Sequence, residues 1–385
     1  MRILIFIHSL SCGGAERVAA SLSWYWAERG HKVTVVTLER VDQDFYHLHP
    51  QVRRVALELA GKSRNVLEAV GANLRRMLAL QKVLKYEAPD VVLSMMTRAN
   101  VLAILAARGL ACSVVVSERT YPPQCYLGRV WEWLRRWSYG LSEAVVALTH
   151  ESADWLRRHT SARRIAIIPN PVSWPLSCQP GAIEPESLFP EGRKIVLAVG
   201  RLTFEKGFDL LLKAFALVGS TRPEWGLVIL GNGPERRSLE ELARSLGIAD
   251  RLFLLGQVGN IGSWYARAEF YVMSSRFEGF PNALVEAMAY GCPAVSFDCD
   301  TGPRDIIRHE VDGLLVAPGD VQALASAMAR LMDDETLRSR FCAKAVEARD
   351  RFSIERIGAM WDRLFEEVTS GRRGMDLTGN AQFNL

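Results

Sequence analysis

Residues 270–289 read FYVMSSRFEGFPNALVEAMA, and this stretch shows the unit from which the chain is built. An apolar run ends at Ser274, a short loop follows, and a helical pattern begins near Asn282. A buried strand joined by a short loop to an amphipathic helix is the repeating unit of a parallel α/β sheet. The stretch therefore predicts an α/β fold.

The same alternation extends in both directions through the 385 residues. We expect strands near 3–7, 32–38, 90–94, 113–117, 144–148, 165–168, 194–200, 227–230, 252–255, 270–274, 294–297 and 313–316. We expect helices near 15–29, 66–85, 99–108, 127–139, 207–218, 234–246, 282–290, 321–332, 335–349 and 354–368. This order predicts two doubly wound, Rossmann-like domains, which bind ligands at the carboxyl ends of their strands.

Proline placement predicts where the domains meet. The first run of elements ends at Pro169-Asn170-Pro171, and four more prolines without periodicity follow up to Gly192. Such a composition is typical of a linker. We expect a first domain over 1–175, a linker over 176–192, a second domain over 193–352, a helix over 353–369 and a disordered Gly- and Arg-rich tail over 370–385.

Composition excludes several classes of protein. Apolar residues make up 49% and charged residues 23%, which is ordinary globular usage. No apolar run approaches the roughly 18 residues of a membrane-spanning helix, and the apolar start is too short for a secretory signal. The 7 cysteines have no regular spacing, so we expect no disulfide framework and a location in the reducing cytosol.

Charge is divided unequally along the chain. Residues 1–180 contain 23 Lys and Arg against 14 Asp and Glu, a net charge of +9, and the remainder carries −5. The basic half indicates an anionic partner, whether a membrane surface, a nucleic acid or a phosphorylated substrate. An ordinary solvated surface is the alternative.

The quoted stretch also carries the densest chemical signal. Free amides at a helix N-terminus attract phosphate, and Glu278 and Glu286 flank the start of the expected helix. Two carboxylates around a phosphate site suit a sugar nucleotide, which has hydroxyls on both sides of its phosphates. Alternatively, Glu278 is a capping acid and Glu286 a surface residue.

Two further loops fit phosphate binding. Residues 200–209 read GRLTFEKGFD, in which Arg201 and Lys206 suit phosphate oxygens; scattered surface charge is the alternative. Gly13 and Gly14 follow the first strand and allow close backbone approach, although a simple tight turn explains them as well. The loop is not GxGxxG, which argues against a dinucleotide-dependent oxidoreductase.

Together these motifs resemble the retaining glycosyltransferases of family 4, which have GT-B architecture: two Rossmann-like domains facing a central cleft. The resemblance spans nearly the whole chain, and its most specific element is the Glu278, seven residues, Glu286 spacing with Arg201 and Lys206 upstream. The Gly-Gly-Ala-Glu-Arg start at 13–17 and the loop at 275–282 are similar to bacterial enzymes that extend lipid-linked or surface oligosaccharides.

The resemblance implies roles for individual residues. Glu286 would hold the ribose hydroxyls and Glu278 the hydroxyls of the transferred sugar, while Arg201 and Lys206 would bind the diphosphate. Gly13 and Gly14 would approach the donor or the acceptor from the first domain. The final helix would pack back on the first domain. Backbone groups would come from Gly279, Phe280, Pro281, Asn282, Ala283 and Leu284.

The chain departs from many relatives after the strand at 113–117, where Glu118 and Arg119 replace a common His. These two residues fit the oligosaccharide-extending subgroup and are candidate acceptor contacts. With no convincing nucleophile, we expect front-face displacement, in which the donor phosphate accepts the acceptor's proton. No acidic, His or Cys cluster has metal-ligand spacing, so we expect no bound metal and no cofactor besides the UDP-sugar substrate.

A helix near 126–141 predicts how the basic half meets its substrate. We expect one apolar stripe with charged residues opposite, a pattern of interfacial helices. The stripe comprises Leu127, Val130, Trp131, Leu134, Trp137 and Leu141, and the opposite side carries Arg129, Glu132, Arg135 and Arg136. A core-packed stripe is the alternative, and nucleic-acid binding lacks a supporting motif. The membrane candidates are Arg129, Trp131, Trp133, Arg135, Arg136 and Trp137.

The sequence thus predicts a metal-independent glycosyltransferase that moves a hexose or N-acetylhexosamine from a UDP-sugar to a polyprenyl-diphosphate-linked or surface glycan. It would act at the cytoplasmic face of the cell membrane. A GDP-sugar donor, a soluble or glycolipid acceptor, or a non-catalytic sugar-nucleotide-binding protein are the alternatives.

Overall fold

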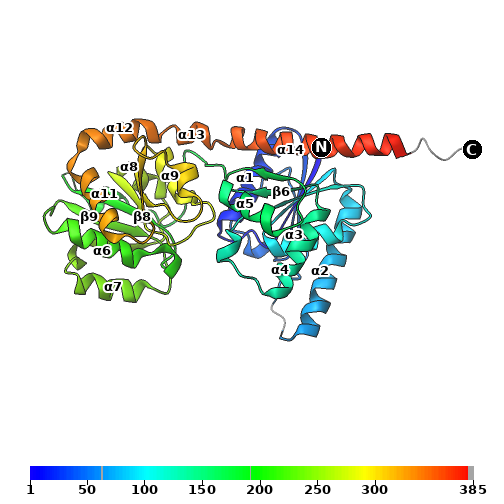
Figure 1. Ribbon diagram of the computed structural model, residues 1–385, viewed down its shortest axis with the longest axis horizontal. Helices are drawn as coiled ribbons and strands as arrows, with labels where there is room; N and C mark the ends of the chain where they lie inside the picture. The colour runs from blue at the N-terminus through cyan, green and yellow to red at the C-terminus, as the bar shows by residue number, and fades with distance from the viewer. Residues whose placement is uncertain (62–63, 191, 380–385) are drawn as a thin grey trace, which may run out of the picture. The chain divides into compact units, whose positions relative to one another are not determined.

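The computed structural model describes residues 1–61, 64–190 and 192–379. The chain forms two compact units (Figure 1). The first unit comprises Met1–Pro171 together with the last helix, α14 (Ile354–Gly379), and the second unit comprises Val172–Ser353. Each unit has its own sheet and its own core, so each is described by itself.

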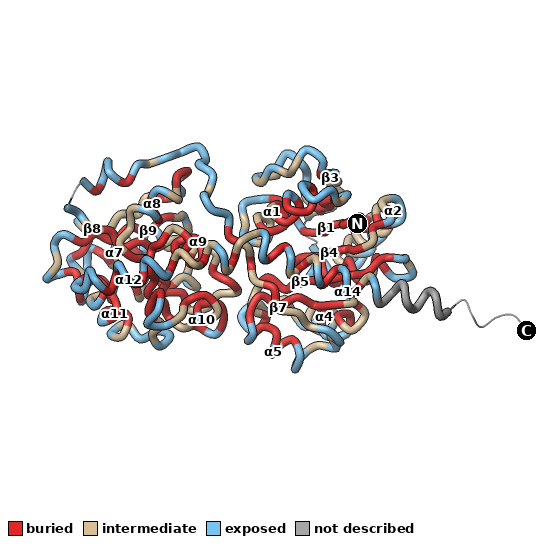
Figure 2. Tube along the Cα trace, turned by 90° about the horizontal axis from the view of Figure 1, so that it is seen from above, coloured by how far each residue is buried: buried red, intermediate tan, exposed pale blue. Residues whose placement is uncertain are grey.

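The first unit is built on a parallel seven-stranded sheet with the order β3-β2-β1-β4-β5-β6-β7. Its strands are rich in β-branched residues, which suit a sheet buried on both faces, and Figure 2 shows β1, β4 and β5 as buried. The order reverses between β1 and β4, which creates a topological switch point at the carboxyl edge. The bounds are β1 (Arg2–Ile7), β2 (Lys32–Thr37), β3 (Arg53–Ala56), β4 (Val91–Met95), β5 (Ser113–Ser117), β6 (Ala144–Ala147) and β7 (Ile165–Ile167).

Helices cover both faces of this sheet. Ile3, Ile5 and Ile7 share a core with α1 and α14, whereas Leu4 and Phe6 share another with α2, α3 and α5. This split follows from the period of two in a strand. The helices are α1 (Gly14–Glu28), α2 (Val66–Glu87), α3 (Thr97–Ala106), α4 (Arg129–Ser138) and α5 (His150–His159).

The second unit repeats the design with a parallel six-stranded sheet of order β10-β9-β8-β11-β12-β13. The order reverses between β8 and β11, which places a second switch point at their carboxyl ends. The strands are β8 (Lys194–Val199), β9 (Trp225–Leu230), β10 (Leu252–Gly256), β11 (Phe270–Met273), β12 (Ala294–Phe297) and β13 (Gly313–Val316). The helices are α6 (Phe208–Gly219), α7 (Arg236–Ser245), α8 (Ile261–Arg267), α9 (Asn282–Ala289), α10 (Pro303–Ile306), α11 (Val321–Asp333), α12 (Glu335–Ala345) and α13 (Ala348–Arg351).

The predicted linker over 176–192 is wrong, because this segment is part of the second unit, which begins at Val172. Phe189 is fully buried with its ring centroid 4.7 Å from that of Phe253, and the Trp264 indole donates to the Ile183 carbonyl at 2.9 Å. The first domain accordingly ends at Pro171 rather than 175. Tertiary contacts of this kind hold the segment in place, and hydrophobic periodicity in the sequence does not reveal them.

Helix α14 packs against α1 of the first unit. The Asp362 carboxylate accepts from the Tyr25 hydroxyl and the Trp26 indole, both at 2.8 Å, and Trp361 and Phe365 are fully buried. The helix continues to Gly379, so the tail predicted from residue 370 is wrong up to that point. Propagating an existing helix is far easier than nucleating one. The rest of that prediction, 380–385, lies outside the described residues.

Candidate active site

Two loops of the second unit meet at the carboxyl edge of its sheet, because their strands β8 and β11 are hydrogen-bonded neighbours. Residues 200–207 follow β8 and residues 274–281 follow β11. The Ser274 hydroxyl donates to the Lys206 carbonyl at 3.0 Å, and the Arg276 amide donates to the Glu205 carbonyl at 2.8 Å. Gly207 has φ +61, and a Cβ there would lie 2.1 Å from the Ser274 carbonyl oxygen, so the close approach requires glycine.

The contact between these loops brings Lys206 and Glu278 together. The Lys206 ammonium lies 2.6 Å from Glu278 Oε1, and the Ser275 hydroxyl donates to the same oxygen at 2.7 Å. The side chains are 21% and 12% exposed, so the pair is shielded yet reachable from solvent. A cation and a carboxylate at the mouth of a parallel sheet can bind phosphate oxygens and sugar hydroxyls, respectively.

Arg276, which sequence reasoning did not single out, braces the two loops. Its guanidinium pairs with both oxygens of Asp209 at 2.8 Å and donates to the Phe204 carbonyl at 2.7 Å. It also lies 4.0 Å from the centroid of the Phe204 ring. Burial opposes ionisation of Asp209, but the hydrogen bonds and charge of Arg276 outweigh it and lower the pKa of that carboxyl. Arg276 and Asp209 are 67 residues apart in the chain, so no local sequence pattern predicts that they pair.

Arg201 lies apart from this pair. Its side chain is 78% exposed, and its only described ion pair is a 3.5 Å contact with Glu205. The structure therefore brings Lys206 to Glu278 but does not bring Arg201 to them. A long exposed side chain can still reach an anion bound above the loop.

Glu286 is a buried residue of α9, 5% exposed, rather than a surface residue. The Tyr265 hydroxyl of α8 donates to its Oε2 at 3.1 Å. A second tyrosine, Tyr271 of β11, is also buried, and its hydroxyl donates to the Val199 carbonyl. Burial raises the pKa of Tyr271, and the charges of Glu278 and Glu286 raise it further. Both carboxylates therefore lie near Tyr271. The sequence did not indicate this, because Tyr271 belongs to an apolar strand.

The start of α9 can bind a ligand through its backbone amides. Its N-cap is Pro281, and no described side chain caps it. The buried Thr301 hydroxyl donates to the carbonyls of Glu278 at 2.6 Å and Gly279 at 3.2 Å, which fixes the peptides leading into the helix. Of the other residues predicted to present backbone, Phe280 and Leu284 are buried, and Asn282 and Ala283 are half-buried. The Leu284 amide already donates to the Pro281 carbonyl at 3.1 Å. Such a helix start favours anions.

The glycine pair of the first unit begins α1. Gly13 is the extended N-cap residue, and a Cβ there would lie 2.2 Å from Glu16 Oε2, so the Glu16 side chain folds back over the glycine. The loop lies at the carboxyl end of β1, beside the switch point of its own sheet.

Glu118 is misassigned as an acceptor contact. It is 1% exposed and accepts from the Thr97 hydroxyl at 2.9 Å and from the Tyr139 hydroxyl. Burial raises the pKa of this carboxyl despite the charge of Arg135 nearby. Arg119 is 7% exposed and remains at the carboxyl edge of β5. We reassign Glu118 to a structural role and retain Arg119.

Helix α4 turns most but not all of the predicted membrane contacts outward. Arg135, a predicted membrane contact, is 2% exposed and pairs with Glu132. Trp131 is half-buried beneath the Arg98 guanidinium. The physical reason is the buried carboxylate of Glu118, 4.0 Å from Arg135, which draws the arginine inward. The exposed members are Arg129, Val130, Trp133, Arg136 and Trp137.

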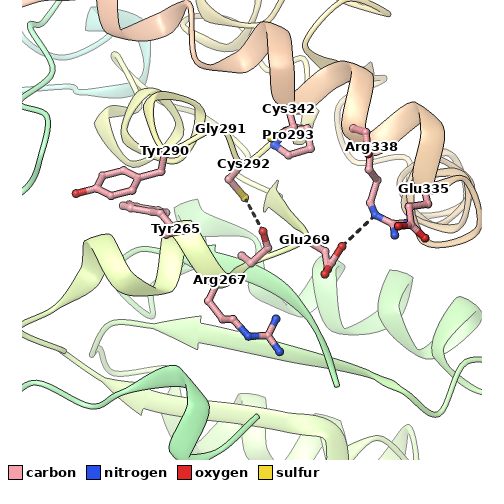
Figure 3. A pocket seen from close by; sticks show the side chains of 13 residues that line it. Tyr265, Arg267, Glu269, Tyr290, Gly291, Cys292, Pro293, Glu335, Arg338 and Cys342 are labelled. Carbon is pink, nitrogen blue, oxygen red and sulfur yellow. Dashed lines mark hydrogen bonds and ion pairs between the residues drawn. The ribbon is translucent and has the colours of Figure 1, made fainter. Parts of the chain in front are cut away.

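A pocket of about 250 Å³ lies at the other edge of the second sheet, at the amino ends of β11 and β12 (Figure 3). Its wall includes the Arg338–Glu269 ion pair of 3.1 Å and the buried Cys292. None of the predicted donor-binding residues lines it. Among the side chains that the structure describes, no group of three or more His, Cys, Asp or Glu is placed to hold a metal ion.

Comparison with known proteins agrees with this geometry. Residues 12–173 match the family described as Glycosyltransferase Family 4, and residues 181–348 match the one described as Glycosyl transferases group 1. The chain is similar to the GalNAc-alpha-(1->4)-GalNAc-alpha-(1->3)-diNAcBac-PP-undecaprenol alpha-1,4-N-acetyl-D-galactosaminyltransferase of Campylobacter jejuni. The two are 30% identical over 370 residues, which span 96% of this chain and 99% of that protein.

A second relative is the exopolysaccharide phosphotransferase SCO2592 of Streptomyces coelicolor, 40% identical over 233 residues. That match covers 60% of this chain but only 24% of the much longer relative. Among solved structures, HepE of Anabaena in complex with UDP shares the fold, with a TM-score of 0.75 and 18% identity over 95% of this chain and 100% of that one. The chain belongs to glycosyltransferase family 4 and has the two Rossmann-like domains of the GT-B architecture.

Proposed function

We propose that the protein is a retaining glycosyltransferase that moves a hexose or N-acetylhexosamine from a UDP-sugar to a polyprenyl-diphosphate-linked or surface glycan. The observation that carries this proposal is the Lys206–Glu278 pair at 2.6 Å, held between two braced loops beside the start of α9. Glu286, buried one turn into the same helix, completes a row of donor contacts.

Each group has a task in donor binding. The Lys206 ammonium leaves Glu278 for the diphosphate, and the freed carboxylate accepts hydrogen bonds from the hydroxyls of the transferred sugar. Glu286 accepts from the ribose hydroxyls, while Gly279 and the first residues of α9 present backbone to the phosphates. Arg201, exposed above the loop, supplies a second cation.

The reaction is a front-face displacement. The bond between the anomeric carbon and the donor phosphate oxygen breaks, and an acceptor hydroxyl oxygen bonds to the same face of that carbon. The acceptor proton passes to the departing phosphate oxygen. Lys206, Arg201 and the α9 amides stabilise the negative charge that develops on the diphosphate, so we propose that neither a metal nor a cofactor is needed.

The choice of substrates rests on the relatives. The Campylobacter protein is named for transfer of N-acetylgalactosamine in α-linkage to a glycan on PP-undecaprenol, and HepE is described with UDP. Transfer with retention of the anomeric configuration gives an α-linked product from an α-linked sugar nucleotide.

Membrane association of the first unit is part of the proposal. No described helix is both long and apolar enough to cross a bilayer. However, α2 exposes Val66, Leu67, Val70 and Leu74 along one side, each at least 50% exposed. Helix α4 exposes its stacked Trp133 and Trp137, and both helices pack on α3.

Cations accompany these apolar side chains. On α2 and α4 the exposed basic residues are Arg75, Lys82, Lys85, Arg129 and Arg136. Exposed apolar groups beside Lys and Arg are typical of helices that lie on an anionic leaflet, and each basic residue near the surface contributes about 1 kcal/mol. We propose docking at the cytoplasmic face of the cell membrane.

The function is tested by supplying the purified chain with a panel of UDP- and GDP-sugars and a short polyprenyl-diphosphate glycan. Nucleotide release identifies the donor, mass spectrometry the product and NMR its anomeric configuration. We expect an α-linked product from a UDP-sugar with the native chain and none with Glu278→Gln. Glu240→Gln, on exposed α7 of the same unit, is the matched control. Donor binding without transfer to any acceptor would refute the proposal.

A further inference from the structure

Arg119 is a buried cation with neutral partners. It lies two residues beyond the end of β5 at the carboxyl edge of the first sheet and is 7% exposed. One terminal nitrogen donates to the Ser117 hydroxyl at 3.2 Å and the other to the Asn170 side-chain oxygen at 2.5 Å. Its Nε has no hydrogen-bond partner among the described residues. Burial lowers the pKa of Arg119 to about 9, which still leaves it charged at neutral pH.

The other two arginines that are buried in the described chain provide an internal comparison. Arg135 pairs with Glu132, and Arg338 lies 3.1 Å from Glu269. For Arg119, no described carboxylate lies within 4.0 Å. Burying a charge without a counter-charge is costly, so an arginine retained in this state indicates an anion that arrives with a ligand.

The amino end of α1 lies at the same carboxyl edge of the first sheet, because α1 follows β1 and Arg119 follows β5. Glu16, in its first turn, is the one group whose charge raises the pKa of Arg119 against the effect of burial. The Glu16 carboxylate folds back over Gly13, and its Oε1 accepts from the Ser9 hydroxyl at 3.3 Å. No described side chain caps this 15-residue helix through a hydrogen bond. A helix start of this kind attracts anions, and the Glu16 carboxylate, on a flexible side chain of the protein, lies over it.

We propose that Arg119 and the amino end of α1 form a phosphoryl-binding site on the first unit, over which the Glu16 carboxylate lies when no ligand is bound. A phosphoryl group that enters the site displaces Glu16, pairs with the free Nε of Arg119 and meets the helix amides. The identity of the ligand rests on the proposed function, in which both the lipid-linked acceptor and the sugar-nucleotide donor carry a diphosphate.

The test measures binding, not sugar transfer, so its outcome is independent of the proposed function. Inorganic pyrophosphate, geranyl diphosphate and UDP are titrated calorimetrically into the full chain and its variants. We expect Arg119→Gln to weaken pyrophosphate binding about tenfold to a hundredfold, the effect of losing charge-assisted hydrogen bonds. Glu16→Gln, which removes the competing carboxylate, should tighten it by about threefold to tenfold. A merely structural role would not move the two variants in opposite directions.

Controls isolate the effect of net charge and of folding. Arg40→Gln and Asp42→Asn break an exposed pair of the same unit with the same changes in charge and should alter binding by less than about twofold. Arg119→Lys keeps the positive charge but loses the paired N–H donors of the guanidinium, so we expect it to bind pyrophosphate several-fold more weakly. This variant provides the test if Arg119→Gln does not fold.

The three probes distinguish the two sources of phosphate. A loss confined to geranyl diphosphate and pyrophosphate assigns the site to the acceptor, and a loss confined to UDP and pyrophosphate assigns it to the donor. Either outcome supports the site. Unchanged binding in Arg119→Gln, weaker binding in Glu16→Gln, or no binding of any probe by the native chain would overturn it.

Discussion

Replacing Arg276 with alanine tests whether the two donor loops must be braced for activity. The ion pair with Asp209 has side chains 23% and 32% exposed, so solvent screening limits it to about 1 kcal/mol. The hydrogen bond to the Phe204 carbonyl adds about 1 kcal/mol, and the contact with the Phe204 ring adds about 0.5–1 kcal/mol. The loops therefore lose about 2.5–3 kcal/mol of mutual attraction.

That loss appears as weaker donor binding, because donor binding must now order the loops. Since each 1.4 kcal/mol is tenfold in affinity, and the Lys206–Glu278 pair remains, we expect the donor KM to rise about tenfold to fiftyfold with a smaller change in kcat. Initial rates at varied donor concentration give both constants, and amide hydrogen exchange of residues 200–207 and 274–281 reports the loop order. Arg237→Ala, on an exposed pair of α7, is the control. An unchanged KM together with unchanged exchange would refute the bracing argument.

Four further outcomes are expected. Glu278→Gln should abolish turnover, whereas Glu286→Gln should mainly raise the donor KM by about tenfold, because it removes one charge-assisted contact; steady-state kinetics separate the two. Turnover should persist after EDTA treatment and dialysis. Leu67→Glu combined with Trp133→Glu should reduce sedimentation with anionic vesicles at least tenfold without changing the melting temperature. Burial raises the pKa of Glu118 in the folded protein, so ionising this carboxyl lowers the free energy of unfolding as the pH rises above about 4.3. Urea denaturation at several pH values measures this decline, and we expect Glu118→Gln to make it shallower.

Each of these has an opposing result. Full activity of either glutamate variant would remove that residue from the donor site, and lasting inactivation by EDTA would contradict metal-independent transfer. Vesicle binding that survives the double substitution would move the docking surface away from α2 and α4. A pH profile of stability that is the same with and without Glu118 would contradict its buried ionisation.

The architecture was predictable because strands and helices alternate with strong local signals. The strands at 113–117, 294–297 and 313–316 have the predicted bounds, since each is a short, mostly apolar run with turn residues nearby. The short strand β3 and helix α8 escaped prediction because few residues define them. The segment at 176–192 was misread because its order depends on the tertiary contacts of Phe189.

The site was predictable only where its residues follow one another along the chain. The loops carrying Lys206 and Glu278 could be read locally, but their brace, Arg276–Asp209, and the tyrosine near both glutamates depend on strand order. The inward turn of Arg135 has the same origin, because Glu118 on a different element lies 4.0 Å from its guanidinium. Pairing between distant polar groups overrides the periodicity of a short helix.

A crystal structure of the chain with a bound UDP-sugar tests the central claim most directly. The account predicts the Lys206 ammonium within about 3 Å of a diphosphate oxygen, Glu278 on the sugar hydroxyls and Glu286 on the ribose. A nucleotide lodged at the Cys292 pocket, or bound with the Lys206–Glu278 pair still closed, would contradict it.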